Sequence, residues 1–232
     1  MNDIGLIGGA NRSRGHPAFS LLELLVVLAL LAVLAVGVVG GRDRAHALAV
    51  PEAQSAVAAA LAAARGRAVA TGRATRLLVN DGPPGGATAR RYLRLLVVQE
   101  QDPAGAGWAT VLVVVLPEGA AVMPSPDRMP TGLLDHSADW TTQSGVAMAS
   151  GALASPAESG AVGEYPADDW SQVIFSPSGV PGTADGSIIL AAARRQPPGN
   201  ALPLILVQPE AARGVQLSRY GVAVPINSPG SW

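Results

Sequence analysis

The first pattern along the chain is an uninterrupted apolar segment from Phe19 to Gly41, in which Glu23 is the single charged residue. A helix over these residues rises about 34 Å, slightly more than the hydrocarbon core of a bilayer, which is about 30 Å thick. We therefore predict that residues 19–41 form a transmembrane helix. A carboxylate inside such a helix needs an explanation, because it costs free energy there.

A second apolar pattern follows over residues 42–72, where the sequence is rich in alanine. The larger apolar residues recur at the spacing of one helix face: Val57, Leu61, Ala64 and Ala68. We expect the same helix to continue through this stretch and to end at Gly72. Pro51 has no amide hydrogen to donate, so we expect a kink near it.

From residue 73 the pattern changes to short apolar, β-rich runs separated by Gly and Pro turns. The expected strands are 74–80, 91–99, 108–116, 172–176, 187–192, 202–208 and 214–220. A long helix followed only by strands predicts an α+β fold, with an antiparallel β-sheet packed on the second half of the helix. Within this β-rich domain (73–224), residues 123–170 lack periodicity and are expected to form a long loop, and residues 225–232 a flexible tail.

Glu23 also bears on how the N-terminus is processed. Arg12 and Arg14 before an apolar run are typical of a secretory signal, and Ala45-His46-Ala47 would offer a signal-peptidase site. A signal that is simply removed gains nothing from the carboxylate. A cut just before Phe19 would instead create an α-amine four residues from Glu23, either in the same helix or in a neighbouring subunit. The amine would then compensate the buried charge.

Composition excludes several classes of function. The chain has no cysteine, which rules out disulfides, thiol nucleophiles and zinc–thiolate sites. Its formal net charge is −1, which gives no global attraction to nucleic acid or acidic lipid. The aromatic residues are few and dispersed, whereas stacking platforms for single strands need them interleaved with basic residues.

Candidate chemistry is sparse as well. Asp135, His136 and Ser137 are neighbours in sequence, whereas the partners of a catalytic triad converge from different segments. Asp168 and Asp169, with Glu164, could supply oxygen ligands to calcium, but they lack the spacing of an EF-hand loop. We predict a protein that is not an enzyme and has no cofactor or metal.

The stretch from Ala18 to Val27, AFSLLELLVV, resembles the class III leader junction of type IV pilins and type II secretion pseudopilins. The resemblance implies a prepilin leader over residues 1–18. It also implies cleavage by prepilin peptidase between Ala18 and Phe19, N-methylation of Phe19, and an assembly role for Glu23. Ala18 stands where the family has glycine. The implied location is the bacterial inner membrane, single-pass, with the C-terminal domain in the periplasm.

Three shorter segments narrow this resemblance. Residues 63–72 are similar to the helix end of the H-type minor pseudopilins and the FimT-type minor pilins, residues 116–120 to their LPxGV turn, and residues 173–179 to their IxFxPxG strand and turn. The implied function is that of a structural subunit, a minor pseudopilin, in a filament built with other pilin or pseudopilin subunits. Prepilin peptidase and the inner membrane are the other implied partners.

Two alternatives remain open. FimT-type minor pilins bind DNA during uptake through basic residues near the C-terminus, where this chain offers Arg213 and Arg219. Nucleic acid is not favoured as a partner, because phosphate contacts scale with the number of cations. The second alternative is an anchored or secreted β-rich protein whose leader only mimics the motif. Such a protein would start near His46 or Leu48 after processing.

Overall fold

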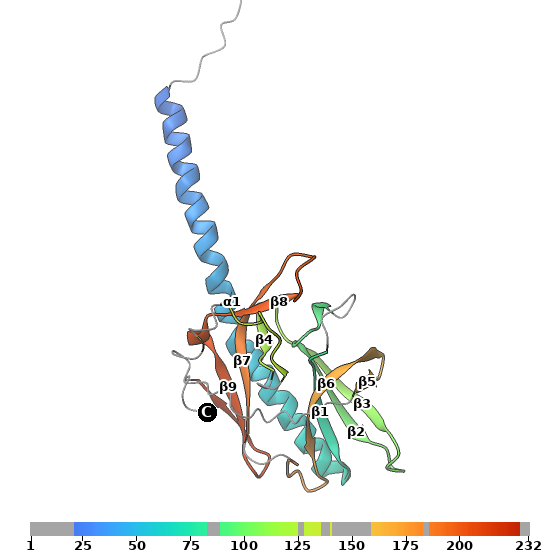
Figure 1. Ribbon diagram of the computed structural model, residues 1–232. Coiled ribbons are helices and arrows are strands. Elements are labelled where there is room, and N and C mark those ends of the chain that lie inside the picture. Colours follow the sequence, from blue (N-terminus) through green and yellow to red (C-terminus); the bar gives the residue numbers. More distant parts are fainter. Residues whose placement is uncertain are drawn as a thin grey trace, which may run out of the picture. The chain divides into compact units, whose positions relative to one another are not determined.

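A computed structural model describes residues 21–82, 89–124, 128–135, 140, 159–182 and 186–227. It divides into two compact units, Met1–Gly41 and Arg42–Trp232. A single helix, α1 (Leu21–Thr71), has 51 residues and runs through both units (Figure 1). Strands follow it, as the α+β prediction required.

The end of α1 agrees with the prediction, whereas Pro51 does not interrupt it. Gly72 follows the last helical residue with a φ of 63°, a left-handed conformation that glycine adopts without steric cost. The Thr71 hydroxyl donates to the carbonyl oxygen of Arg67 at 2.9 Å. Pro51 lies inside the helix, and the Ser55 hydroxyl donates to its carbonyl oxygen at 3.0 Å. A bend at Pro51 stays a prediction.

The strands form two antiparallel sheets, where the sequence had indicated one. The first sheet has the order β3-β2-β1-β6-β5 and the second the order β10-β9-β7-β4, with β8 also paired to β7. The first consists of β1 (Thr75–Asn80), β2 (Leu95–Gln101), β3 (Trp108–Val115), β5 (Ser159–Val162) and β6 (Tyr165–Phe175). The second consists of β4 (Ala120–Val122), β7 (Gly186–Arg195), β8 (Leu204–Val207), β9 (Arg213–Leu217) and β10 (Ala223–Ile226), and the short helix η3 (Pro209–Ala211) precedes β9.

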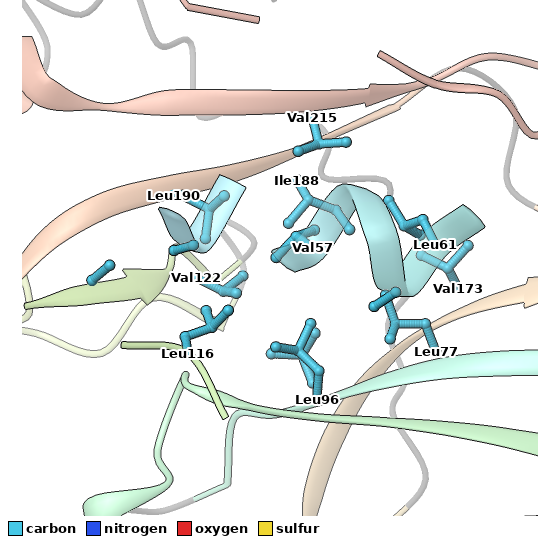
Figure 2. Close-up of a cluster of buried hydrophobic side chains, with 14 of the residues drawn as sticks. Val57, Leu61, Leu77, Leu96, Leu116, Val122, Val173, Ile188, Leu190 and Val215 are labelled. Carbon is cyan, nitrogen blue, oxygen red and sulfur yellow. The ribbon is translucent and has the colours of Figure 1, made fainter. Parts of the chain in front are cut away.

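The main hydrophobic core places the second half of α1 between the two sheets. Figure 2 shows Val57 and Leu61 with Leu77 and Leu96 of the first sheet on one side and Ile188 of the second on the other. All five side chains are buried. The apolar face expected at Val57 and Leu61 is therefore confirmed. Both sheets need it, because each buries one face against the helix.

The region expected to be a long loop contains a β-hairpin. β5 and the first residues of β6 lie within residues 123–170, and they fold over the outer face of the first sheet. There Val162 and Tyr165 pack with Leu78 of β1 and Val97 of β2. β1 is consequently buried on both faces. Sequence periodicity missed the hairpin because its partner surface is far away in the chain.

The expected C-terminal tail begins later than residue 225. β10 pairs with β9, and Pro225 is opposite Val215 in that ladder. The Gln54 amide of α1 donates to the carbonyl oxygens of Gly214 at 2.7 Å and Ile226 at 2.9 Å. These bonds tie the last described strands to the helix, and residues 228–232 lie outside the described residues.

Candidate functional site

The predicted processing site falls at the edge of what the structure describes. Ala18 and Phe19 lie outside the described residues, and Glu23 is described only through the helical backbone of α1. Cleavage before Phe19 and the pairing of Glu23 with an α-amine therefore remain predictions.

The first turns of α1 have an apolar surface on every side. Five consecutive residues, Leu24 to Leu28, are each 45–60% exposed. Successive residues on an α-helix point about 100° apart, so five in a row surround the axis. A helix that is apolar all round is stable in apolar surroundings, which another protein or a bilayer supplies. By the criteria of length and mean hydropathy, none of the helices among the described residues qualifies as a membrane span.

The other end of α1 is joined to the first sheet by a charged cluster. Glu100 of β2 has a side chain that is 4% exposed and lies between two arginines. Arg67 of α1 donates through Nε to Glu100 Oε2, and Arg73 Nη1 lies 2.6 Å from Oε1. The hydrogen bond from Arg67 is the main reason why the pKa of Glu100 is below its usual value; burial opposes this shift, and the charges of Arg67 and Arg73 reinforce it.

Removing this carboxylate should change how stability depends on pH. The folded-state pKa of Glu100 is lowered, so its ionised form stabilises the fold at pH values above the usual pKa of 4.5. That stabilisation is lost as the pH falls from 4.5 through the lowered folded-state pKa. We expect Glu100→Gln to lower the melting temperature at neutral pH and to flatten its decline in acid. Thermal unfolding followed by circular dichroism at a series of pH values measures both effects.

The matched control is Glu118→Gln, which removes a carboxylate that is 78% exposed. It should change the melting temperature little at any pH, because exposed ion pairs contribute little to stability. An identical pH profile for the two variants would contradict the role given to Glu100.

The two arginines considered for nucleic acid do not form one patch. Arg213 begins β9 and donates to the carbonyl oxygen of Asn227, whereas Arg219 follows the end of the same strand. β9 is five residues long, so its two ends lie about 13 Å apart. Arg219 donates to the Tyr220 hydroxyl at 2.8 Å and covers that ring at 4.8 Å. Arg65 of α1 donates to the carbonyl oxygen of the same tyrosine at 3.1 Å.

Two of the acidic residues considered for catalysis or metal binding, Asp135 and Asp169, have arginine partners. Arg128 lies 3.1 Å from Asp81 Oδ2 and 3.4 Å from Asp169 Oδ2, and Arg194 lies 3.2 Å from Asp135 Oδ2. Across the described ranges, no three His, Asp or Glu side chains are grouped so as to hold a metal ion. His136 lies outside those ranges.

The structure also brings together three arginines that the sequence does not link. Arg90 and Arg94 precede β2, Arg195 ends β7, and all three line one groove. Periodicity and spacing carry no signal for this grouping, because about a hundred residues separate its two halves.

Comparison with known proteins identifies a motif near the N-terminus. Residues 14–39 match the family described as "Prokaryotic N-terminal methylation motif". No curated protein sequence matches the chain significantly. Among solved structures, the minor pseudopilin EpsH from the Type 2 Secretion System of Vibrio cholerae is similar, with a TM-score of 0.40 and 12% identity over 79% of this chain and 99% of that one. The matched segment contains Ala18, Phe19 and Glu23, so the chain carries an N-terminal methylation motif of the prepilin type, as its sequence had indicated.

Proposed function

We propose that this chain is a structural subunit, a minor pseudopilin, of a pilus-like filament in a type II secretion or type IV pilus-like system. The observation that carries the proposal is the methylation motif at residues 14–39. Prepilin peptidase cuts between Ala18 and Phe19, and Phe19 is then N-methylated. Residues 19–41 cross the inner membrane once, and the β domain lies in the periplasm.

The apolar start of α1 supports this role. Leu24 to Leu28 present apolar side chains in every direction, and such a surface needs lipid or other apolar helices around it. The membrane supplies lipid around the helix before assembly, and a bundle of like helices surrounds it afterwards. Within that bundle, Glu23 of one subunit pairs with the α-amine of Phe19 in its neighbour, which compensates two charges that are costly to bury singly.

Two turns in the β domain support the narrower assignment to a minor pseudopilin. The segments that resemble the H-type proteins include Gly119 and Gly179, which have φ values of 97° and 77°. A Cβ at Gly179 would lie 2.8 Å from Val69 Cγ2, so the turn after β6 can press against α1 only with glycine there. The second of these motifs therefore places a loop against the helix, which is a structural task.

The proposal gives the chain a structural role in assembly. The second half of α1 is packed between two sheets, and Arg67 binds Glu100 of β2. Force applied to the helix is therefore transmitted to the β domain. Other pilin or pseudopilin subunits are the partners.

Determining the mature N-terminus tests the proposal. We expect the chain isolated from membranes of a host that has prepilin peptidase to begin at N-methylphenylalanine, Phe19. Edman sequencing together with intact mass detects both the cut and the added methyl group. In a host without the peptidase the same chain should keep residues 1–18. A start near His46 or Leu48 in either host would contradict the proposal, because the apolar helix would then have been removed.

A further inference from the structure

A groove with an excess of positive charge lies between the turn that precedes β2 and the β7–β8 hairpin. Arg90, Arg94 and Arg195 line it, and Glu118 is the one carboxylate among its lining residues. Three positive charges and one negative charge leave a net charge of +2. The groove opens into a neighbouring hollow of about 400 Å³ that shares Arg90 and Arg195 with it.

The charges of this groove are poorly compensated by the residues that the structure describes. Arg195 Nη1 is 3.8 Å from Glu118 Oε1, at the outer limit for an ion pair, and both side chains are more than half exposed. No carboxylate of the described residues pairs with Arg90. Arg94 donates to the carbonyl oxygens of Leu116 at 2.6 Å and Arg90 at 3.3 Å, but its Nε is buried without a hydrogen-bond partner among the described residues.

The pKa of Arg94 also indicates that the positive charge of the groove is incompletely compensated. Burial lowers the pKa of Arg94, the carboxylate of Glu118 opposes that shift, and the positive charge of Arg195 adds to it. A bound anion would remove the repulsion between these cations and offset the loss of hydration. The groove is therefore complementary to an anion.

The rest of the lining combines apolar residues with two polar ones, Gln196 and Asn200. The β7–β8 hairpin contributes Pro197, Pro198, Leu202 and Pro203 to the hollow. An anion alone needs no such surface, whereas a phosphate that is attached to a glycerol backbone and acyl chains does. A carboxylate on an acidic peptide would satisfy the arginines but would leave these prolines and the leucine exposed.

The groove lies at the end of the domain where α1 enters it. Ile205 and Val207 of β8 pack in the same cluster as Ala49 and Val50 of α1, and Figure 1 shows β8 beside this part of the helix. Ala49 is eight residues beyond Gly41 in the chain. Under the proposed membrane anchor, residues 42–48 are all of the chain that lies between the proposed span and this end of the domain.

We propose that Arg90, Arg94 and Arg195 bind the phosphate of an anionic phospholipid headgroup at the membrane surface from which α1 emerges. This inference rests on the proposed membrane anchor and adds a second, lipid-specific contact to it. The arginines contact the phosphate, and the Pro-rich hairpin lies against the glycerol region. The contact holds the β domain close to the membrane before the subunit enters a filament.

Reconstitution of the full chain into lipid vesicles tests this. The chain has no cysteine, so Ala201→Cys, at an exposed position beside the groove, accepts a single environment-sensitive fluorophore. Vesicles of phosphatidylcholine receive increasing fractions of phosphatidylglycerol. We expect the emission to shift to the blue as phosphatidylglycerol rises, and salt to weaken this response. Arg90→Gln or Arg195→Gln should raise the fraction needed for half of the shift by about fivefold each.

The control is Arg219→Gln, which removes the same charge near the opposite end of β9 and should leave the response unchanged. Flotation of the vesicles reports the anchor separately. If the chain floats but its emission ignores phosphatidylglycerol, or if Arg219→Gln has the same effect as Arg195→Gln, the groove inference fails and the proposed function stands. If the chain floats with none of the vesicles, both the groove inference and the proposed membrane-anchored function are overturned. A shift caused by inorganic phosphate or by an acidic peptide on phosphatidylcholine vesicles overturns the assignment to lipid.

Discussion

Replacing Leu61 with alanine is expected to lower the free energy of unfolding by about 3–5 kcal/mol. The Leu61 side chain is fully buried, on the face of α1 that both sheets share. Alanine leaves a cavity there that two separate sheets would have to move to fill. For a domain of this size the loss corresponds to a fall in melting temperature of about 6–20 °C.

Denaturant unfolding of the full chain in detergent, followed by circular dichroism, measures this loss. Leu48→Ala is the matched control, since it makes the same change in the same helix at a side chain that is 76% exposed. We expect the control to change the unfolding free energy by less than about 0.5 kcal/mol. Equal effects at the two positions would mean that α1 is not held between the sheets.

Replacing Glu23 with valine is expected to reduce incorporation into filaments by about 100-fold or more while leaving membrane insertion and cleavage unchanged. The variant removes the carboxylate but leaves the methylated amine of Phe19, which is still charged and must be buried. Losing one partner of a buried pair costs about 3–5 kcal/mol, enough for a loss of this size. Valine itself is at least as compatible with a membrane helix as glutamate.

Cross-linking of subunits in membranes measures assembly, and intact mass measures cleavage in the same sample. Glu52→Val is the control, because it removes an exposed carboxylate farther along the same helix. Normal assembly of Glu23→Val would show that the carboxylate has no charge-pairing role, although the chain could still be a filament subunit. Loss of cleavage would place the effect of Glu23 at the peptidase instead.

The elements predicted best were those whose signal is local. The end of α1 followed from Gly72, and the strands at 75–80 and 108–115 lie within one residue of their predicted bounds. Each depends on residues that are close together in the chain. The strand predicted at 91–99 was placed less well, because Arg91 to Arg94 form a turn in which Leu93 has a φ of 57°.

The β5–β6 hairpin and β10 were missed for a physical reason. β5 is four residues long and includes two small residues, Gly160 and Ala161, so it has little apolar periodicity. Its stability comes from covering Leu78 and Val97, which lie 65 residues or more earlier. β10 contains Pro225, which is tolerated because the strand lies at the edge of its sheet. Only the assembled sheets reveal that both segments have partners.

By itself the sequence determined the methylation motif, the long helix, the α+β class and the charged position at Glu23, because each is written in neighbouring residues. Tertiary structure alone decided that α1 lies between two sheets, that Glu100 is bound by Arg67 and Arg73, and that Arg90 and Arg195 line one groove. Those features depend on segments that meet only when the strands pair. The pairing of the strands depends on which faces of the sheets are covered by α1 and by the β5–β6 hairpin. No single stretch of the chain encodes that coverage.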